Sequence, residues 1–356
     1  MKICILGNGL TSLTLAKSLV NKGINVDIFS NNNLKIQNNN RTIGISKSNL
    51  EFFNKDILNI QNKTWDINEI EVYSENFYNK KILSFKNNNQ KVFSIVKNSE
   101  LINKLLSELK KNKLFNFYKK EFSQTMMNND YKLIFNCDFN NFITKKFFYK
   151  KIIKDYDSNA FTSTINHKRV DNNTAAQVFT TRGPLAFLPI SHTKTSIVYS
   201  VKGSNKINFE NLVKKYNFKY NIVDIQKPSS FKLKSFVLRS YYHKNIIAFG
   251  DLLHKLHPLA GQGFNMTLRD IKEILRLIDL KIENGLDIDI SICSDFEKNM
   301  RYKNYLFLNG IDFIYEFFNF ENKTKNNLLS KSIKFLGKNK MINQVFTKFA
   351  DNGLVI

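Results

Sequence analysis

The stretch from Ile246 to Asp270 constrains the fold more than any other part of this chain. Its first residues, Ile246 to Phe249, form an apolar run of the length expected for a buried strand. The run ends at Gly250-Asp251, which places a carboxylate at the carboxyl end of a strand, where open α/β sheets bind ligands. A turn with two glycines follows, and from Phe264 apolar residues recur at three- and four-residue steps, which predicts a helix. The acid would accept hydrogen bonds from hydroxyls, while the turn's N–H groups and the helix dipole would face an anion.

This order of strand, acid, glycine turn and helix resembles the second FAD-binding motif of the aromatic-ring flavoprotein monooxygenases. The most similar pattern is that of their ubiquinone-biosynthesis hydroxylase branch, GD-x-x-H-x-x-x-P-x-x-G-Q-G-x-N-x-x-x-x-D. The residues on that pattern are Gly250, Asp251, His254, Pro258, Gly261, Gln262, Gly263, Asn265 and Asp270. The resemblance implies non-covalent FAD, held by these residues except His254 and Asp270. A lone G-Q-G turn would favour a strand, loop and helix that merely pack together, but this match is long and ordered.

The first thirty residues predict a strand, a glycine turn, a helix and a second strand. Lys2 to Leu6 is the strand, Gly7-Asn8-Gly9 is the turn, and the helix ends at the stop signal Gly23. A dinucleotide-binding fingerprint requires this order, with one glycine for the turn and another for the close approach of a pyrophosphate. We therefore expect Gly7 and Gly9 to contact the cofactor.

Two positions of this first unit depart from the usual fingerprint. Ser12 replaces the third glycine or alanine, and it is small enough for close packing. Ser30 follows the second strand, where an acid usually binds the adenosine ribose. Asp27 lies inside that strand and is expected to point elsewhere. Ser12 and Ser30 are included among the predicted cofactor-binding residues.

Three further strings have counterparts in the same family. Arg41 opens R-T-I-G-I-S, and the resemblance places it near the flavin and phosphates; an ordinary solvated arginine is the alternative. Asn98 opens an N-x-x-L string whose polar residue approaches the cofactor; a helix cap at Asn98 or Ser99 is at least as well supported. Asp138 follows the strand Tyr131 to Phe135 and matches the acid of the family's A-D-G string.

The A-D-G string departs from the family at both neighbours of the acid. Cys137 replaces the alanine, and Phe139 replaces the glycine. A phenylalanine ring fills space that glycine leaves open. Either the ring is accommodated, leaving an active site with altered access for the reductant, or it occludes the site and leaves a weak FAD binder.

The predicted fold is a doubly wound α/β, Rossmann-like FAD-binding domain interleaved with an antiparallel-sheet substrate domain and a C-terminal helical segment. We assign residues 1–64, 98–150 and 241–290 to the FAD-binding domain and residues 65–97 to inserted sheet strands. Residues 151–240 form the antiparallel-sheet substrate domain, and residues 291–356 form the C-terminal helices. The C-terminal segment would be a buried pair of helices, or an apolar surface with a basic rim that docks on a membrane or partner.

The β-rich region contains a string, Phe179 to Pro189, that resembles the family's F-T-x-x-G-P-x-A-x-L-P. In the family this string lies on the sheet that covers the substrate pocket. We expect a turn at Gly183-Pro184, and we take Phe187 and Pro189, with Pro258, as pocket candidates. No side chain is assigned as a catalytic acid or base, because the flavin carries the chemistry.

Composition limits the other function classes. Among 356 residues, 54 are Lys or Arg and 30 are Asp or Glu, a formal net charge of +24. The excess is spread along the chain with no nucleic-acid-binding motif, so we expect no nucleic-acid partner. Three scattered cysteines and five histidines lack metal-ligand spacing, which predicts no metal and reduced thiols in a cytoplasmic protein. A basic surface would attract anionic lipid at the inner face of a membrane, so peripheral association is expected.

The resemblance implies that NAD(P)H reduces FAD, that O2 reacts with the reduced flavin, and that an aromatic ring is hydroxylated. The implied substrate is a lipid-like polyprenylated phenol of ubiquinone biosynthesis. Two alternatives stay open: an FAD oxidoreductase of the same fold without hydroxylation, such as a prenyl reductase, and a non-catalytic subunit of a quinone-biosynthesis complex. Ser30 and Phe139 motivate the second.

Overall fold

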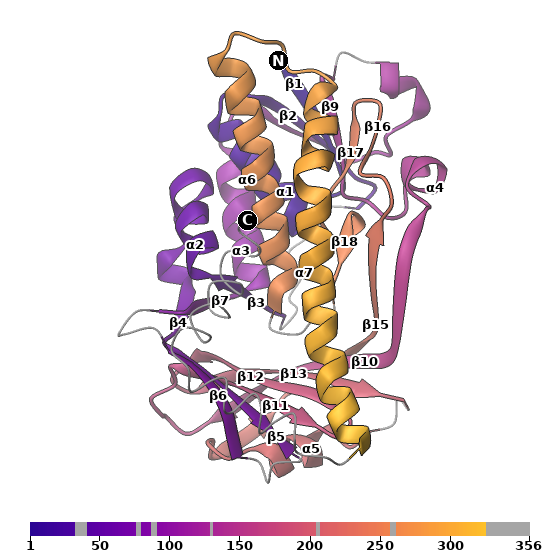
Figure 1. The fold of residues 1–356 in the computed structure, drawn as a ribbon. Helices are drawn as coiled ribbons and strands as arrows, with labels where there is room; N and C mark the ends of the chain where they lie inside the picture. The colour runs from indigo at the N-terminus through magenta and orange to yellow at the C-terminus, as the bar shows by residue number, and fades with distance from the viewer. Residues whose placement is uncertain are drawn as a thin grey trace.

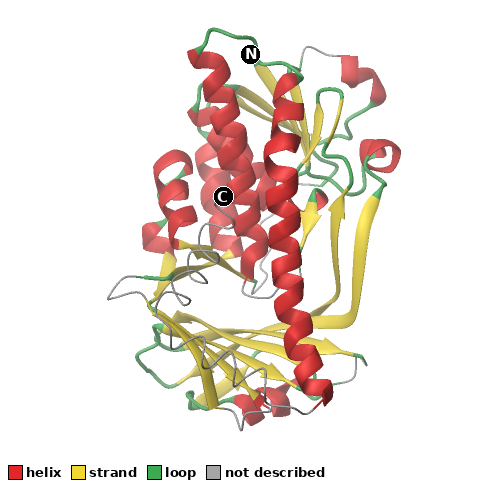
Figure 2. Cartoon of the chain, viewed as in Figure 1, coloured by secondary structure: helices red, strands yellow, loops and turns green. Residues whose placement is uncertain are grey.

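A computed structural model describes residues 1–32, 41–75, 80–86, 91–128, 131–203, 207–256 and 261–324. The molecule has a helix-rich half that contains a six-stranded sheet, and a second half built on a nine-stranded sheet (Figures 1 and 2). One long helix, α7 (Ser291–Thr324), runs along both halves. The mixed α/β class expected from the sequence is confirmed.

The six-stranded sheet has the strand order β16-β17-β9-β1-β2-β8. Its strands are β1 (Lys2–Leu6), β2 (Asn25–Phe29), β8 (Phe115–Tyr118), β9 (Leu133–Asn136), β16 (Tyr242–His243) and β17 (Ile246–Ala248). Every neighbouring pair is parallel except β16 with β17. The central strands are apolar along their length because both faces of a parallel sheet are covered. Parallel pairing also places the carboxyl ends of β17, β9, β1 and β2 at one edge.

Helices surround this sheet. The α-helices are α1 (Leu10–Asn21), α2 (Lys47–Phe52), α3 (Asn98–Lys110), α4 (Phe142–Phe147) and α6 (Gln262–Glu283), and the shorter turns are η1 (Phe53–Ile57), η2 (Gln61–Lys63), η4 (Gln124–Asn128) and η5 (Gly250–Leu252). Helix α1 packs against α3 and α6, and α7 packs against α6. The expected cap of α3 at Asn98 or Ser99 is wrong, because the chain passes directly from strand to helix. Lys97 is the extended N-cap residue, and no side chain caps the helix.

The strands between residues 65 and 97 do not form one inserted sheet. Strands β4 (Thr64–Ile67) and β7 (Phe93–Lys97) join β3 (Thr42–Ser46) in a three-stranded antiparallel sheet. Strands β5 (Glu69–Ser74) and β6 (Lys80–Lys86) instead extend the nine-stranded sheet, where β5 pairs with β11. The turn expected at residues 87–89 lies outside the described residues.

The nine-stranded sheet is mainly antiparallel. Its other strands are β10 (Lys151–His167), β11 (Thr174–Thr180), β12 (Gly183–Ser191), β13 (Lys194–Lys202), β14 (Ile222–Ile225), β15 (Ser229–Leu238) and β18 (His254–Lys255). One face packs against α5 (Phe209–Tyr216) in a core of its own. The opposite face meets the three-stranded sheet, where Leu188 packs against Phe93 and its neighbours. A hydrogen bond of 2.9 Å between the hydroxyls of Thr42 and Ser196 joins the two sheets.

The turn before β12 differs from the sequence prediction by two residues. Thr181 and Arg182 form the loop, and Gly183 already pairs with Thr180 as the first residue of β12. Gly183 has φ +134°, and a Cβ there would lie 2.3 Å from the carbonyl oxygen of Ser200. Glycine is therefore required by the close approach of β13 rather than by the turn itself.

Helix α7 connects the two halves through its side chains. Phe318 stacks on Phe179 of β11 with ring centroids 3.6 Å apart, and Asp312 accepts a hydrogen bond from Tyr156 of β10. Other aromatic residues of α7 are exposed, including Tyr302, Tyr305 and Phe313. The segment is therefore both a buried helix and an aromatic surface. The second helix expected from 328 to 349 lies outside the described residues.

Candidate cofactor site

Hydrogen bonds continue past the ends of the parallel strands and align the motif segments at one edge. The N–H of Gly7 donates to the carbonyl of Phe29 at 2.9 Å, and the N–H of Cys137 donates to Leu6 at 2.9 Å. The N–H of Phe249 donates to Asn136 at 2.8 Å. The residues that follow β1, β2, β9 and β17 consequently lie side by side at the carboxyl edge, where α/β sheets bind ligands.

The first glycine turn leaves bare backbone at this edge. Gly7 has φ +98°, and a Cβ there would meet Cys137 and Asp138 at 3.4–3.5 Å. A Cβ on Gly9 would meet nothing within 4 Å, so this residue borders open space. Gly9 is the N-cap of α1, with no side-chain cap and no acid in the first turn. The N–H groups and the dipole of α1 are thus directed at a place suited to a phosphate.

The GD motif is pressed against the same helix. Gly250 has φ +64°, and a Cβ there would lie 2.5 Å from Cγ2 of Thr11 in the first turn of α1. Only glycine permits this contact without displacement of α1. The next residue, Asp251, is exposed although Gly250 and Leu252 are buried. The carboxylate therefore lies at the surface of the edge, beside the first turn of α1.

The second glycine turn begins α6. Gly261 is its N-cap in the left-handed conformation, φ +64°, and no side chain caps the helix. A Cβ on Gly263 would meet nothing within 4 Å. Gly261 also lies 3.7 Å from the backbone nitrogen of Gly44 in β3, measured from the position its Cβ would occupy. Sequence reasoning missed Gly44, although it occupies a variable position of the R-x-I-x-L-S string that Arg41 opens.

The side chain of Asn265 has no atom left for a cofactor. It is fully buried; its Oδ1 accepts from the Ser46 N–H at 2.9 Å and from Asn49 at 3.1 Å, and its Nδ2 donates to Gly44 at 3.0 Å. The side chain is therefore not available to a cofactor, and a cofactor contact through the backbone of Asn265 stays a prediction. Asn265 instead fixes the start of α6 against β3 and α2. The buried Asn49 belongs to the same network and was not singled out from the sequence.

Three other predicted residues are buried at the edge. Ser12 is 1% exposed, and its hydroxyl lies within hydrogen-bonding reach of the Cys137 thiol. Gln262 is 5% exposed and accepts a 3.4 Å hydrogen bond from Arg269. The hydroxyl of Ser30 accepts from the Asn32 N–H at 3.2 Å. At the end of β2 a neutral hydroxyl therefore stands where the fingerprint has an acid.

Asp27 points away from this edge, as expected. Its carboxylate is fully buried and accepts hydrogen bonds from Tyr131 at 2.6 Å and Asn116 at 3.0 Å. Lys2 forms an ion pair with it at 2.7 Å. This carboxylate cannot replace the missing ribose-binding acid, because its partners lie within the sheet and occupy it.

The structure brings Arg41 and Asn98 together. The N–H of Asn98 donates to the carbonyl of Arg41 at 2.9 Å, at the end of the pairing between β3 and β7. Arg41 is exposed and Asn98 is 8% exposed. Arg41 directly precedes β3, and Asn98 directly follows β7 as the first residue of α3. Their contact with a cofactor remains a prediction from the resemblance. Pro258 lies outside the described residues.

Phe139 does not lie against the glycine turn. Its ring is 40% exposed and packs edge-on against Phe236 of β15, with centroids 6.0 Å apart. The ammonium of Lys151 lies 5.5 Å from the ring centroid. Asp138, by contrast, has its Cβ 3.5 Å from the position a Gly7 Cβ would take. The Phe139 side chain therefore points toward the nine-stranded sheet, while Asp138 lies at the carboxyl edge beside Gly7.

Phe187 is on the opposite face of its sheet from the one that a substrate pocket would use. Its ring packs in the α5 core, 6.1 Å from the ring of Tyr220. Pro189, two residues on, shares that side of the strand because side chains alternate. Phe187 therefore packs against α5, and the role of Phe187 and Pro189 in a substrate pocket stays a prediction. Leu188 and Val198 on the other face are partly exposed.

A buried polar chain lies behind the GD motif. Nε2 of His254 is 2.5 Å from Oδ2 of Asp270, and Asn304 of α7 donates to Oδ1 of Asp270 at 3.1 Å. Burial by itself lowers the pKa of His254, but the charge of Asp270 and the hydrogen bond to it raise the pKa by more, and Asp251 adds to this. These two motif residues therefore connect β18, α6 and α7 within the protein.

The described residues contain no group of three or more His, Cys, Asp or Glu side chains that would hold a metal ion. All three cysteines are free. Desolvation raises the pKa of Cys137 to about 12 and that of Cys293 to about 12, so both thiols stay protonated at neutral pH. A neutral Cys137 is compatible with its place beside Asp138, where a thiolate would add a second negative charge.

Comparisons with known proteins show what the chain is similar to in sequence and in fold. No family model matches the chain. In sequence it is similar to the ubiquinone biosynthesis monooxygenase COQ6 of Rattus norvegicus, 24% identical over 205 residues, covering 45% of this chain and 43% of the relative. The ubiquinone hydroxylase UbiL of Rhodospirillum rubrum is 25% identical over 164 residues, covering 43% and 38%. The chain thus matches less than half the length of these curated relatives.

Solved structures define the fold over the whole chain. The p-nitrophenol 4-monooxygenase PnpA of Pseudomonas putida superimposes with a TM-score of 0.80 at 11% identity, covering 99% of this chain and 98% of its own. HpxO of Klebsiella pneumoniae, complexed with FAD and uric acid, gives 0.76 at 10% identity, covering 99% and 97%. The fold is that of FAD-dependent monooxygenases. The resemblance inferred from the motifs is confirmed. The relatives found by sequence similarity carry ubiquinone-biosynthesis names.

The residues at the edge fit FAD on structural grounds. Gly9 and Gly263 face open space, the helices α1 and α6 begin without side-chain caps, and Asp251 offers an exposed carboxylate between them. The diphosphate of FAD needs open glycine backbone at the start of a helix, and its polyol chain needs a hydrogen-bond acceptor such as a carboxylate. Its ring system, which carries negative charge, suits the start of a second helix. The ribose end is less complete, since Ser30 replaces the acid.

Asp251→Ala is expected to weaken FAD binding. The change removes acceptors for the hydroxyls of the ribityl chain, at about 1.5–3 kcal/mol, which is roughly a tenfold to hundredfold rise in the dissociation constant. Titration of FAD with detection by flavin fluorescence measures it. Asp287→Ala removes an equally exposed carboxylate from the loop after α6 and serves as the control. Equal dissociation constants for the two variants would contradict the role of Asp251.

His254 is expected to make the stability of the fold depend on pH. A histidine with a raised pKa stabilises the folded state below its unfolded-state pKa, and this contribution is lost as the pH rises through the folded-state pKa. His254→Ala leaves Asp270 buried without its partner, at a cost of about 3–5 kcal/mol. Urea unfolding across the pH range should show the difference between native protein and His254→Gln shrink as the pH rises. His243→Gln, at a site whose pKa is lowered by burial, should not show this trend. A pH-independent difference for His254→Gln argues against a charged pair.

Proposed function

We propose that this chain is an FAD-dependent monooxygenase that hydroxylates the aromatic ring of a polyprenylated phenol in ubiquinone biosynthesis, with NAD(P)H as reductant and O2 as oxidant. The observation that carries the proposal is the cofactor edge, where two uncapped helix starts and the exposed Asp251 converge on bare glycine backbone. The ubiquinone-biosynthesis names of the sequence relatives support the substrate class.

Bound FAD supplies the redox and oxygen-activating chemistry. The residues of this chain bind and orient it. The start of α1 and Gly9 would hold the diphosphate, Asp251 would accept from the ribityl hydroxyls, and the N–H groups at Gly261 to Gly263 would face the negatively charged edge of the ring system. Asn265 holds this last turn in place through β3. Arg41 and Asn98, side by side at the end of β3 and β7, are proposed to approach the same cofactor.

The substrate ring is proposed to lie between the cofactor edge and the nine-stranded sheet. On that face Val198, Leu188 and Thr162 are partly exposed although they lie within the sheet. Apolar side chains there would orient an aromatic ring and exclude water from it, which protects a reactive oxygen-transfer step. No described side chain is needed as a dedicated acid or base, since the flavin performs the transfer.

The two alternatives differ from this proposal in what the protein does with FAD and O2. An oxidoreductase of the same fold would consume NAD(P)H without transferring oxygen to the ring. A non-catalytic subunit would require an obstructed or decayed site. The packing of Phe139 against Phe236 argues against obstruction, and Ser30 is the remaining departure at the edge.

Turnover under isotopically labelled O2 tests the function. The FAD-loaded protein, NAD(P)H and a polyprenylated phenol should give a product that contains one labelled oxygen on the ring. Phe139→Gly should reduce its flavin at the same rate as the native protein, because the ring lies outside the cofactor edge. NAD(P)H consumption without label in the product would favour the oxidoreductase. Flavin reduction in the Phe139→Gly variant alone would favour the non-catalytic subunit.

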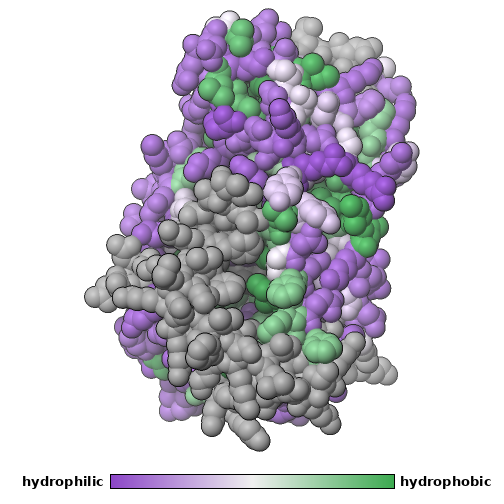
Figure 3. Space-filling view, in the orientation of Figure 1, coloured by the Kyte–Doolittle hydropathy of each residue, from purple (hydrophilic) through white to green (hydrophobic). Residues whose placement is uncertain are grey.

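We further propose peripheral association with an anionic membrane surface. None of the helices in the described ranges combines the length and the apolar character needed to cross a bilayer. Apolar side chains gather over the middle of α7 and the adjoining strands on the face shown in Figure 3. Ile152, 50% exposed, shares the face of β10 with Lys154, which pairs with Asp312 of α7 at 3.5 Å, and the next residue of α7, Phe313, is 69% exposed. Exposed apolar residues beside lysines suit a lipid interface.

Flotation with vesicles tests this association. Recovery with anionic vesicles should be high at low salt and fall at high salt, because each lysine or arginine near the surface contributes about 1 kcal/mol and salt screens it. Neutral vesicles are the control for charge, and the double variant Ile152→Asp/Phe313→Asp is the control for the apolar contact. Equal recovery with and without anionic vesicles would dismiss direct lipid binding.

A further inference from the structure

The first part of β10 is a free edge of the nine-stranded sheet. Strand β15 pairs with it on one side from Lys151 to Asp155, whereas the pairing with β13 on the other side begins only at Ser158. No other described strand pairs with residues 151–155. This part of β10 runs along the margin of the molecule in Figure 1. An edge strand presents backbone N–H and C=O groups with which another strand can pair.

The backbone groups of alternate residues point out of this edge. Leu238 is the partner of Lys151 in β15, and its N–H donates to the carbonyl of Leu253 at 3.0 Å, on the side of β15 away from β10. Opposed residues of an antiparallel pair alternate between bonding to each other and both pointing outward. The backbone groups of Lys151 therefore point outward, and so do those of Ile153 and Asp155.

The free edge is bounded at both ends. Strand β10 begins at Lys151, and a bulge between Asp155 and Ser158 shifts its register, with Asp157 at φ +46°. A bulge bends a strand and interrupts regular pairing. The segment open to a new strand is therefore residues 151–155, with Ile153 at its centre.

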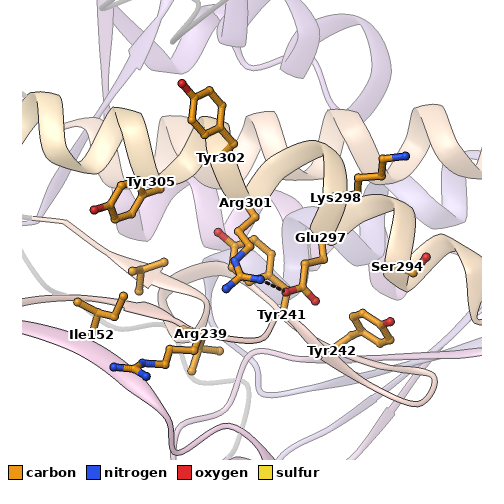
Figure 4. A pocket seen from close by; sticks show the side chains of 12 residues that line it. Ile152, Arg239, Tyr241, Tyr242, Ser294, Glu297, Lys298, Arg301, Tyr302 and Tyr305 are labelled. Atoms are coloured by element: carbon orange, nitrogen blue, oxygen red, sulfur yellow. Dashed lines mark hydrogen bonds and ion pairs between the residues drawn. The ribbon is translucent and has the colours of Figure 1, made fainter.

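The side chains of this segment divide between two faces of the sheet. Ile152 lines the surface hollow beside α7 (Figure 4), and Lys154 forms ion pairs with two carboxylates of α7. Lys151, Ile153 and Asp155 lie on the other face because side chains alternate along a strand. The face away from α7 thus carries a cation, an apolar residue and an anion in that order.

The three residues of this face have groups that a partner strand could satisfy. The ammonium of Lys151 lies 4.6 Å from the ring centroid of Phe236; burial lowers its pKa, and no carboxylate of the described residues pairs with it. Ile153 is 61% exposed. Asp155 is exposed, with two lysines of β15 at 3.4 and 3.6 Å from its carboxylate. An order of cation, apolar residue and anion is complementary to its own reverse.

We infer that this chain forms a two-fold symmetric dimer in which residues 151–155 of two copies pair as antiparallel strands. With Ile153 on the two-fold axis, each Lys151 lies opposite Asp155 of the second copy, and the two Ile153 side chains lie opposite each other. The same register joins the outward-pointing backbone groups of these residues as hydrogen-bonded pairs. A second copy is the partner that supplies this charge order by symmetry.

Sedimentation velocity of the purified protein at micromolar concentrations and low salt measures the dimer. Ile153→Asp places two carboxylates opposite each other on the two-fold axis, and it should raise the dimer dissociation constant at least tenfold. Val223→Asp changes a 70% exposed apolar residue of β14 and should change the constant less than twofold. Circular dichroism checks that each variant is folded.

Exchange of the two charges tests the register. Lys151→Glu faces Asp155 of the second copy, and Asp155→Lys faces Lys151, so each single variant should dimerise more weakly than the native protein. Lys151→Glu/Asp155→Lys restores opposite charges across the axis and should dimerise more tightly than either single variant. A double variant as weak as the single variants contradicts this pairing.

Cysteine cross-linking places the axis. Ile153→Cys should give a disulfide-linked dimer on oxidation with copper phenanthroline, because Cα atoms of a hydrogen-bonded pair are about 5.5 Å apart. Ile152→Cys is the matched control, since its two copies are two residues out of register and beyond the roughly 7 Å limit for a disulfide. The native protein, whose three cysteines are free, provides the background.

Three results overturn the inference. They are equal cross-linking of Ile152→Cys and Ile153→Cys, native-like dimerisation of Ile153→Asp, and a native protein that stays monomeric at every concentration. The last result would leave the edge of β10 to a strand of another protein.

Discussion

The structure depends on the close contact between Gly250 and the first turn of α1. Parallel pairing of β1 with β9 and of β9 with β17 brings the two glycine motifs to one edge, although more than 230 positions separate Thr11 from Gly250 in the chain. A side chain on Gly250 would collide with Thr11. The bare backbone of Gly250 therefore packs directly on the Thr11 side chain, which brings the start of α1 and the Asp251 carboxylate to the same edge.

A second set of buried polar contacts holds the elements behind that edge. Asn265 connects α6 to β3, and His254 with Asp270 connects β18 to α6 and, through Asn304, to α7. Helix α7 in turn contacts the nine-stranded sheet at Phe179 and Tyr156. Residues that match a cofactor motif by sequence therefore divide between those that border the ligand site and those that hold its support in position.

Sequence reasoning succeeded where function follows from local order along the chain. The strand, turn and helix around Gly7 and around Asp251 appear where they were predicted, because glycine turns and apolar periodicity are local signals. It could not decide which face of an element is covered by which neighbour. Phe187 and Leu188 are adjacent apolar residues, and only the tertiary structure places the first in the core with α5 and the second against the three-stranded sheet. The same holds for Phe139, whose ring packs against Phe236 of β15, a residue far away in the sequence.

The sequence by itself determined the fold class, the two glycine motifs and the exposed acid between them, since each is specified by residues close together in the chain. Tertiary structure alone decided that residues 65–97 divide between two sheets, that the side chain of Asn265 bonds to backbone groups of β3, and that His254 and Asp270 connect β18 to α6. These features arise from contacts between residues far apart in the sequence, and no local pattern encodes which partner a side chain will meet.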